Sequence, residues 1–269
     1  MILDKFNKSY QTQKNKVKIC FYGRHVVFSA LKKNSFVDVK NLFFLKNKID
    51  NLEALIKNNK SVNSLILNKD KFTEKFKDIE NHQGIVAFGD YLFFDFNDLR
   101  QEKFSKNFFF LVLENTFDQH NFGAIIRTAY AFGINGIIIP SEEQVSITST
   151  TAKTSSGALF QMKIYRIGSL TKTLGFLKKS KFKVVTSVIS SEKKSDFQNF
   201  KGDLERIVLV LGSEDSGVTK KLYNIADMNI LIELKNNFNS LNVSVAAALL
   251  MSVILQKSKN RLRVFKNLK

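Results

Sequence analysis

Continuous apolar runs and helical periodicity alternate through the second half of the chain. The runs FFFLVLE at 108–114 and RIVLVLG at 206–212 contain no polar alternation, which is typical of strands buried on both faces. Between them, NFGAIIRTAYAFG at 121–133 has apolar residues at helical spacing, and LNVSVAAALLMSVILQK at 241–257 is the longest helical pattern. This alternation predicts an α/β domain at 107–269 whose mostly parallel sheet is covered by helices. We expect further strands at 136–140, 182–189 and 228–234, and a helix at 169–180.

A smaller α/β pattern precedes the domain predicted at 107–269. Residues 19–98 alternate short strand-like and helix-like segments, which predicts a separate small domain. Its expected strands are ICFYG, DVKNLFFLK, VNSLILN and GIVAFGDYLFF, and its expected helices are HVVFSALKKN and NLEALIKNN, the latter at 51–59. Residues 1–18 are polar and rich in lysine, which predicts a flexible basic arm. The charged stretch 98–107 is expected to link the two domains.

The charge favours a polyanionic partner. The 269 residues include 42 Lys and Arg against 24 Asp and Glu, giving a formal charge of +18. Such an excess most often indicates nucleic acid, although a chain crowded with Lys, Asn, Phe and Ile also reflects a general compositional bias. Arginine is scarcer, with seven against 35 lysines, so an arginine inside a motif is more informative. The tail 257–269 is basic and could contact RNA phosphates.

Several classes of protein are excluded or disfavoured. The single Cys20 permits no intramolecular disulfide and no Cys-rich zinc site, and the wide separation of the three histidines in sequence disfavours a metal centre built from histidines. No apolar stretch reaches the length of about 20 residues that a membrane span needs, and no signal core is present, so we expect a cytoplasmic protein. The chain lacks GxGxxG, HExxH and GxSxG. GSEDSGVT at 212–219 is not a P-loop, because Val218 stands where the phosphate-binding lysine belongs.

Polar residues gather in three loops that follow predicted strands, where ligands bind in open α/β sheets. In the first, Asn121 lies at a helix start and Arg127 six residues later, about 9 Å along the axis. Asn121 could equally be a helix cap. Arg127 could be a solvated helix arginine, although its apolar neighbours favour a half-buried position.

The second loop follows the strand that ends at Gly212, where a residue without a side chain lets a ligand approach the backbone. Glu214 follows two residues later and could also be an ordinary surface carboxylate. In the third loop, Ser240 and Asn242 precede the longest helical pattern, and Ser240 could simply cap it. The pattern alone indicates an RNA-associated α/β protein with a ligand site at three loops.

Taken together, the segments HNFGAIIRTAYAFG, LVLGSEDSG and SLNVSVAAALL resemble, in order and spacing, the three motifs of SpoU-type RNA 2′-O-ribose methyltransferases of the SPOUT superfamily. FYGRHVVFSAL and NHQGIVAF resemble the substrate-binding domain of many members. Three departures are visible, one of them KNNF at 235–238 in place of a more Gly-rich stretch. Gln119 stands where proline is common, and Glu233 follows Ile232 where the family usually has Ile-Pro.

The resemblance implies a trefoil-knotted α/β domain that forms homodimers with the active site at their interface. It implies S-adenosylmethionine as cofactor, no metal, and methylation of a guanosine ribose in 23S rRNA, with a tRNA-modifying enzyme or a non-catalytic RNA-binding or ribosome-assembly factor as alternatives. It places the catalytic centre at Asn121, Arg127, Glu214, Ser240 and Asn242, and the cofactor contacts at Gly212, Ile232 and Leu241.

Overall fold

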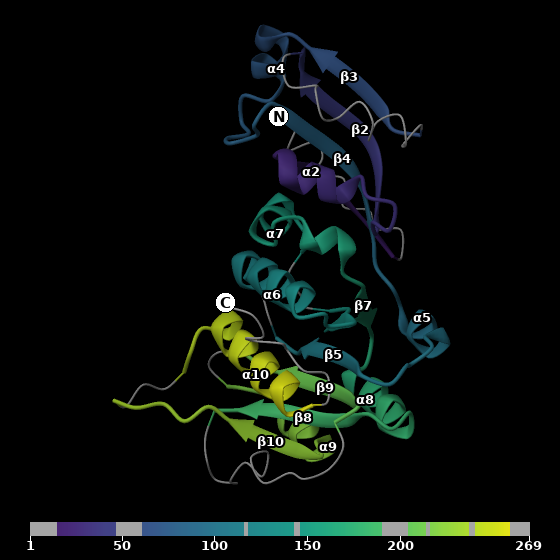
Figure 1. The fold of residues 1–269 in the computed structure, drawn as a ribbon, viewed down its shortest axis with the longest axis vertical. Helices are drawn as coiled ribbons and strands as arrows, with labels where there is room; N and C mark the ends of the chain where they lie inside the picture. Colours follow the sequence, from purple (N-terminus) through teal and green to yellow (C-terminus); the bar gives the residue numbers. More distant parts are fainter. Residues whose placement is uncertain are drawn as a thin grey trace, which may run out of the picture. The chain divides into compact units, whose positions relative to one another are not determined.

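The chain divides into two compact units in the computed structural model (Figure 1). The first comprises residues 1–93 and 146–163, and the second comprises 94–145 and 164–269. The structure describes residues 15–46, 61–115, 118–142, 146–189, 204–213, 216–236 and 240–258. The helix expected at 51–59, most of the basic arm, Glu214 and nearly all of the basic tail lie outside these ranges.

The first unit is built on a four-stranded sheet of order β1-β4-β2-β3. Strand β4 pairs antiparallel with β1 and with β2, and β3 lies parallel to β2 at the edge. Strand β1 begins at Lys16, inside the stretch expected to be a flexible arm. Helix α4 was not expected; it contributes Phe72 to an apolar cluster with Cys20 and Phe88. The elements are β1 (Lys16–Tyr22), α2 (Arg24–Ala30), β2 (Val37–Leu45), β3 (Asn63–Leu67), α4 (Lys69–Lys75) and β4 (Ile85–Leu92).

A segment from the middle of the chain completes this unit. Residues 146–163, which hold α7 (Ser149–Thr154) and η2 (Ala158–Gln161), pack against β1 and α2. The Ser29 hydroxyl donates a hydrogen bond to the Gly157 carbonyl at 2.7 Å. The rings of Phe21 and Phe160 lie with centroids 4.7 Å apart. The N-terminal unit is therefore built from two stretches of the chain that more than fifty residues separate.

Ser29 packs closely against Gly157, so a side chain at position 157 is expected to destabilise the protein. Gly157 has φ +81°, and a Cβ there would lie 2.7 Å from the Ser29 Cβ. We expect Gly157→Ala to lower the free energy of unfolding by about 3 kcal/mol, combining left-handed strain with overpacking. Chemical denaturation of Gly133→Ala provides the control, because Gly133 has φ +72° but no atom within 4 Å of a Cβ. Equal losses in both variants would show that the Ser29 contact is not tight.

The second unit contains a six-stranded, wholly parallel sheet of order β10-β8-β9-β5-β6-β7. This confirms the predicted fold class, with its parallel sheet and smaller N-terminal domain. The expected strands and long helices are present; the short helices α5 and α9 were not expected. The elements are α5 (Phe96–Gln101), β5 (Phe108–Leu113), α6 (Gln119–Ala131), β6 (Gly136–Pro140), β7 (Ile164–Ile167), α8 (Leu170–Lys179), β8 (Lys183–Val188), β9 (Arg206–Leu211), α9 (Lys220–Ile225), β10 (Met228–Leu231) and α10 (Val243–Lys257).

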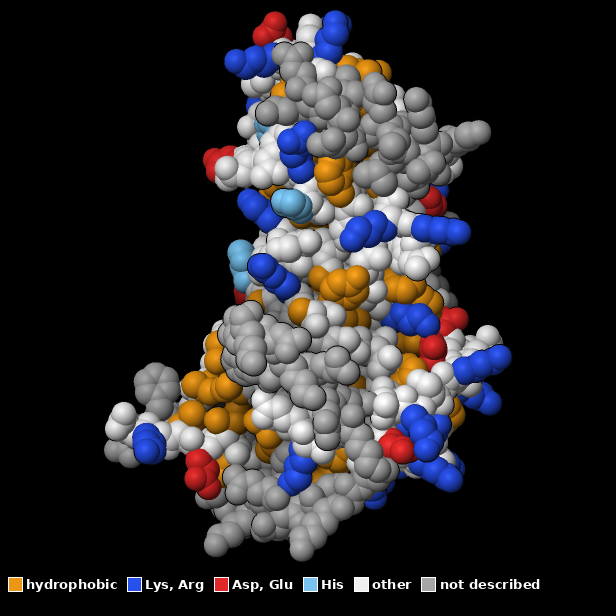
Figure 2. Space-filling view, viewed as in Figure 1, with side chains coloured by type: hydrophobic (Ala, Val, Ile, Leu, Met, Phe, Trp, Pro, Cys, Tyr) orange, Lys and Arg blue, Asp and Glu red, His pale blue; other side chains and the backbone are white. Residues whose placement is uncertain are grey.

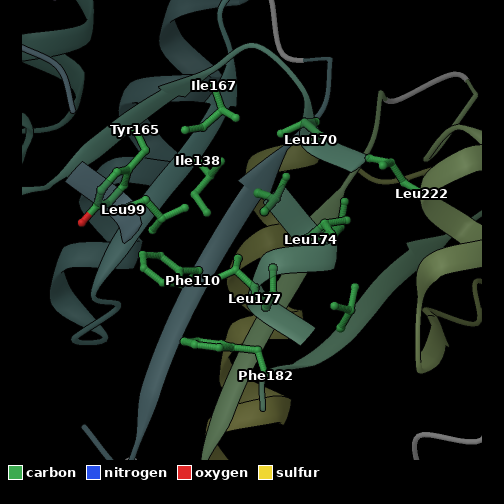
Figure 3. Packing of buried hydrophobic residues seen from close by; sticks show 14 of the residues in the cluster. Leu99, Phe110, Ile138, Tyr165, Ile167, Leu170, Leu174, Leu177, Phe182 and Leu222 are labelled. Atoms are coloured by element: carbon green, nitrogen blue, oxygen red, sulfur yellow. The ribbon is translucent and has the colours of Figure 1, made fainter. Parts of the chain in front are cut away.

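Helices cover both faces of this sheet. On one face, Phe110 and Ile138 from the strands meet Leu174 and Leu177 of α8 in a large buried cluster (Figure 3). Because side chains alternate along a strand, Leu111 points to the opposite face, where α6 and α10 pack against each other. The expectation of strands buried on both sides is therefore confirmed. Because β8, β9 and β10 run parallel, their carboxyl ends lie at the same edge of the sheet.

The stretch expected to be a linker is structured. Its first residues, 98–101, form the second part of α5, a helix that opens with a capping box between Asp95 and Asp98. Further on, the Arg206 guanidinium donates to the carbonyls of Phe104, Ser105 and Ser180. The contact division of the chain falls earlier, between residues 93 and 94. Across the described residues, no helix is long and apolar enough to cross a membrane.

Candidate functional site

A pocket of about 540 Å³, measured with its open mouth, lies at the carboxyl ends of β8, β9 and β10. Three segments supply most of its lining: 187–189 at the end of β8, 211–213 at the end of β9, and residues of 240–243 at the start of α10. Apolar side chains and backbone dominate this lining, with serine hydroxyls as polar groups. Its lining of apolar side chains, backbone groups and hydroxyls suits a small organic ligand, at the sheet edge where parallel α/β folds bind ligands.

Four of the residues singled out from the sequence line this pocket. They are Gly212, Ser240, Leu241 and Ile232. Two loops contribute them: Gly212 follows β9, and the other three residues lie between β10 and α10. The structure thus brings the residues expected to hold the cofactor to one place, together with one residue expected at the catalytic centre.

Gly212 begins a tight loop whose geometry excludes any side chain. The Ser213 amide donates to the Gly217 carbonyl and the Gly217 amide donates to the Ser213 carbonyl, both at 3.1 Å. A Cβ on Gly212 would lie 1.9 Å from the Gly217 carbonyl oxygen. The sequence interpretation linked this glycine to close approach of a ligand; in the structure its nearest neighbour is the loop itself. Glu214 falls within this loop but outside the described residues.

A direct hydrogen bond joins the first and third motifs. The Asn242 Nδ2 donates to the Asn121 Oδ1 at 2.9 Å, linking the start of α10 to the start of α6. The alternative that Asn121 caps α6 is wrong, because Asp118 is the cap and accepts from the Asn121 amide at 2.6 Å. Ser240 as the cap of α10 is also wrong, since Asn242 occupies that position. Both asparagines therefore lie at helix starts, next to the pocket residues Leu241 and Val243.

Arg127 lies two helical turns beyond Asn121, on an exposed position of α6. The expectation of a half-buried arginine is wrong for the single chain, because its flanking residues Ile126 and Ala129 point into the core while Arg127 points outward. It is not among the residues that line the pocket. Its guanidinium is therefore available to a partner outside this chain.

The sequence reasoning missed one buried carboxylate beside the site. Glu114 directly follows β5 and is only 8% exposed. Its two oxygens accept hydrogen bonds from the amide and the hydroxyl of Thr219. The sequence did contain a signal for this residue. A carboxylate that directly follows a fully apolar strand needs a hydrogen-bonding partner, because an unpaired buried charge is costly.

The described residues give little support to a metal site or to a cysteine nucleophile. They contain no group of three or more His, Cys, Asp and Glu side chains that could hold a metal ion. Cys20 is buried, and burial raises the pKa of its thiol to about 12. That thiol stays protonated at neutral pH, so it is not an activated nucleophile.

Family profiles match both parts of the chain. The SpoU rRNA methylase family matches residues 109–252, and the RNA 2′-O ribose methyltransferase substrate-binding family matches residues 20–90. A TrmH family tRNA/rRNA methyltransferase of Staphylococcus aureus is 32% identical over 238 residues, covering 87% of this chain and 94% of that protein.

Solved structures show the same fold. The SpoU methyltransferase AviRb of Streptomyces viridochromogenes, in complex with AdoMet, superposes with a TM-score of 0.74 at 15% identity, covering 95% of this chain and 98% of that one. The AdoMet-bound rRNA methyltransferase of Sinorhizobium meliloti gives a TM-score of 0.71 at 21% identity, covering 89% and 87%. At these identities the likeness concerns the fold.

Proposed function

This chain belongs to the SpoU rRNA methylase family and is an RNA methyltransferase, and we propose that it methylates a ribose 2′-hydroxyl of RNA with S-adenosylmethionine as donor. The observation that carries the proposal is the pocket at the carboxyl ends of β8, β9 and β10, lined by Gly212, Ile232 and Leu241 and flanked by the Asn121–Asn242 hydrogen bond.

The chemistry of the residues that line the pocket suits this cofactor. Apolar side chains of Val188, Ile232 and Leu241 offer a surface for an aromatic ring, while serine hydroxyls and backbone groups offer hydrogen bonds. When bound, S-adenosylmethionine supplies a methyl group on a positively charged sulfur, already activated toward a weak nucleophile. The protein then has to position the ribose hydroxyl and stabilise negative charge on its oxygen.

Arg127 is the group proposed to stabilise that charge. A guanidinium keeps its proton in proteins, so it acts as a fixed positive charge rather than as a base. The Asn121–Asn242 bond fixes the helix carrying Arg127 to the loop 240–243 that lines the pocket. We assign to Asn121, Ser240 and Asn242 the holding of the ribose and its loops, and to Glu214 the orientation of Arg127.

The proposed substrate is a guanosine of large-subunit ribosomal RNA. The match of residues 20–90 to a substrate-binding family supports a dedicated RNA-recognition unit. A tRNA substrate is the second candidate, because the name of the Staphylococcus aureus relative covers both tRNA and rRNA. The basic charge of +18 suits either RNA.

We further propose that the chain acts as a homodimer, with the trefoil knot that the resemblance implies. On α10, Val245, Leu249 and Val253 recur every four residues and form one apolar stripe. Tyr130 on the adjoining α6 is exposed too, and these four side chains are between 45% and 48% exposed. Hydrophobic side chains gather at the left edge of Figure 2, beside the area where Figure 1 draws α10. A stripe of this kind favours a self-complementary interface.

Disrupting the stripe is expected to separate the dimer. Leu249→Arg places a charge in the middle of the proposed interface, where burial without a partner is costly. We expect a monomer by analytical ultracentrifugation and at least a tenfold loss of methyl transfer. Leu65→Arg is the matched control, since Leu65 lies on β3 of the other unit and is 49% exposed. A Leu249→Arg protein that stays dimeric and active would remove this interface from consideration.

Titration with S-adenosylhomocysteine tests the proposed function at the cofactor step. Isothermal titration calorimetry is expected to show one site per chain with micromolar affinity. A non-catalytic RNA-binding protein that kept only the fold has no need of this ligand. Absence of binding by a folded wild-type protein would therefore rule out the proposed activity.

A further inference from the structure

We propose that Glu114 is a positioning residue that holds the loop 212–218 in the shape that binds the cofactor. The inference rests on the proposed function, because that function identifies S-adenosylmethionine as the ligand of the pocket. Glu114 lies at the end of β5, next to the strand β9 from which the loop departs. It is not among the residues that line the pocket, so its action is indirect.

Glu114 contacts both ends of the loop. Its backbone amide donates to the carbonyl of Leu211, the last residue of β9, at 2.9 Å. Its carboxylate accepts from the Thr219 amide at 2.7 Å and from the Thr219 hydroxyl at 2.6 Å. Thr219 directly follows the loop and precedes α9. One residue thus fixes the points at which the loop leaves and rejoins the packed fold.

The hydrogen bonds between Glu114 and Thr219 have the properties expected of an anchor for the loop. A carboxylate that is 8% exposed is stable only when hydrogen bonds compensate its desolvation, and hydrogen bonds to an ionised acceptor are among the stronger ones. A threonine at a helix start usually accepts a bond from its own helix. The Thr219 side chain makes no such bond to α9 and donates its hydroxyl to Glu114 instead.

The loop between these anchors transmits their position to the pocket. Gly212, Ser213 and Gly217 all line the pocket. The paired bonds between Ser213 and Gly217, and the close approach of Gly212 to Gly217, hold these three described residues of the loop together. Their placement therefore depends on the two points at which the loop leaves and rejoins the packed fold. Releasing Thr219 from Glu114 is expected to displace the pocket-lining backbone.

Four variants test this role in the full-length protein. Glu114→Ala removes both acceptors, Thr219→Val removes only the hydroxyl, and Glu114→Gln keeps an acceptor for the Thr219 amide. Asp227→Ala is the matched control, because that carboxylate also accepts from a backbone amide, of Val184 at 2.8 Å, and pairs with Lys178. Asp227 lies at the amino ends of β8 and β10, at the sheet edge away from the pocket.

The dissociation constant for S-adenosylhomocysteine and the two KM values separate positioning from general stability. For Glu114→Ala we expect at least tenfold weaker binding and a similar rise in KM for S-adenosylmethionine, with KM for RNA within twofold. Thr219→Val should weaken binding three- to fivefold, and Glu114→Gln should stay within threefold. Asp227→Ala should lower Tm comparably to Glu114→Ala yet leave the dissociation constant within twofold.

Hydrogen exchange of the Ser213 and Gly217 amides gives a readout that needs no cofactor. We expect at least tenfold faster exchange in Glu114→Ala and no change in Asp227→Ala. The proposal is overturned if Glu114→Ala keeps wild-type binding and exchange, or if Asp227→Ala impairs binding equally. If Glu114→Ala does not fold, Thr219→Val decides by the same criteria. Wild-type protein that binds no S-adenosylhomocysteine would refute the proposed function, whereas the exchange data would still report on the anchor.

Discussion

Replacing Arg127 with alanine is expected to lower kcat at least 100-fold while changing the affinity for S-adenosylhomocysteine less than threefold. Arg127 is exposed on α6 and does not line the pocket, so cofactor binding does not depend on it. Its fixed positive charge acts on the RNA phosphate or on the developing alkoxide, where a 100-fold effect corresponds to about 2.7 kcal/mol. Single-turnover methyl transfer measures this step without interference from product release.

Arg100→Ala is the control for this prediction. Arg100 is another exposed helix arginine of the same unit, on α5, and its loss should leave kcat within twofold. Arg127→Lys keeps the charge but not the planar fork, so an intermediate rate is expected. An Arg127→Ala enzyme that retains more than a tenth of the wild-type kcat would contradict the assigned role.

Gly212→Ala is expected to weaken binding of S-adenosylhomocysteine at least 100-fold. The added Cβ would lie 1.9 Å from the Gly217 carbonyl oxygen, and backbone cannot yield as a flexible side chain does. The loop 212–218 has to open, which moves Gly212, Ser213 and Gly217 away from their places in the pocket. The sheet beneath is packed independently of the loop, so the protein should still fold, with an unfolding free energy lower by about 1–3 kcal/mol.

Gly175→Ala provides the comparison for this second variant. Gly175 lies within α8, and a Cβ added there would have no atom of another residue within 4 Å beyond its own helix and chain neighbours. Alanine at this position should therefore raise helix stability by about 0.5–1 kcal/mol. Cofactor binding should be unchanged. If Gly212→Ala binds within threefold of wild type, the pocket at this edge is not where the cofactor binds.

The six-stranded sheet could be predicted from the sequence because its central strands are continuous apolar runs. Strands β5 and β9 are wholly or almost wholly buried, and only a sheet covered on both faces accommodates such segments. Since parallel strands end at one edge, the loops after them had to converge. This is why one ligand site could be expected at these loops, and Gly212, Ile232 and Leu241 do line a single pocket there.

Contacts between distant residues could not be predicted from local pattern. The bond from Glu114 to Thr219 spans 105 residues, that from Asn121 to Asn242 spans 121, and that from Ser29 to Gly157 spans 128. No periodicity encodes such pairings. The packing of 146–163 into the N-terminal unit was missed for the same reason.

The sequence also failed to predict which residue caps helix α6 and how exposed Arg127 is. Asp118 precedes Asn121 by three residues and competes with it as a cap, and both residue types are favoured there. Arg127 was expected to be half-buried because of its apolar neighbours. On a helix those neighbours turn toward the core while the arginine turns away.

The most direct test of the proposed activity is transfer of labelled methyl groups from S-adenosylmethionine to RNA from a strain that lacks the modification. The RNA is separated into large rRNA, small rRNA and tRNA and then digested to nucleosides. We predict label in large rRNA, recovered as 2′-O-methylguanosine and absent with the Arg127→Ala protein. Label in tRNA would keep the chemistry and overturn the substrate. No label in any fraction, from wild-type protein that binds S-adenosylhomocysteine, would contradict methyl transfer to these RNAs.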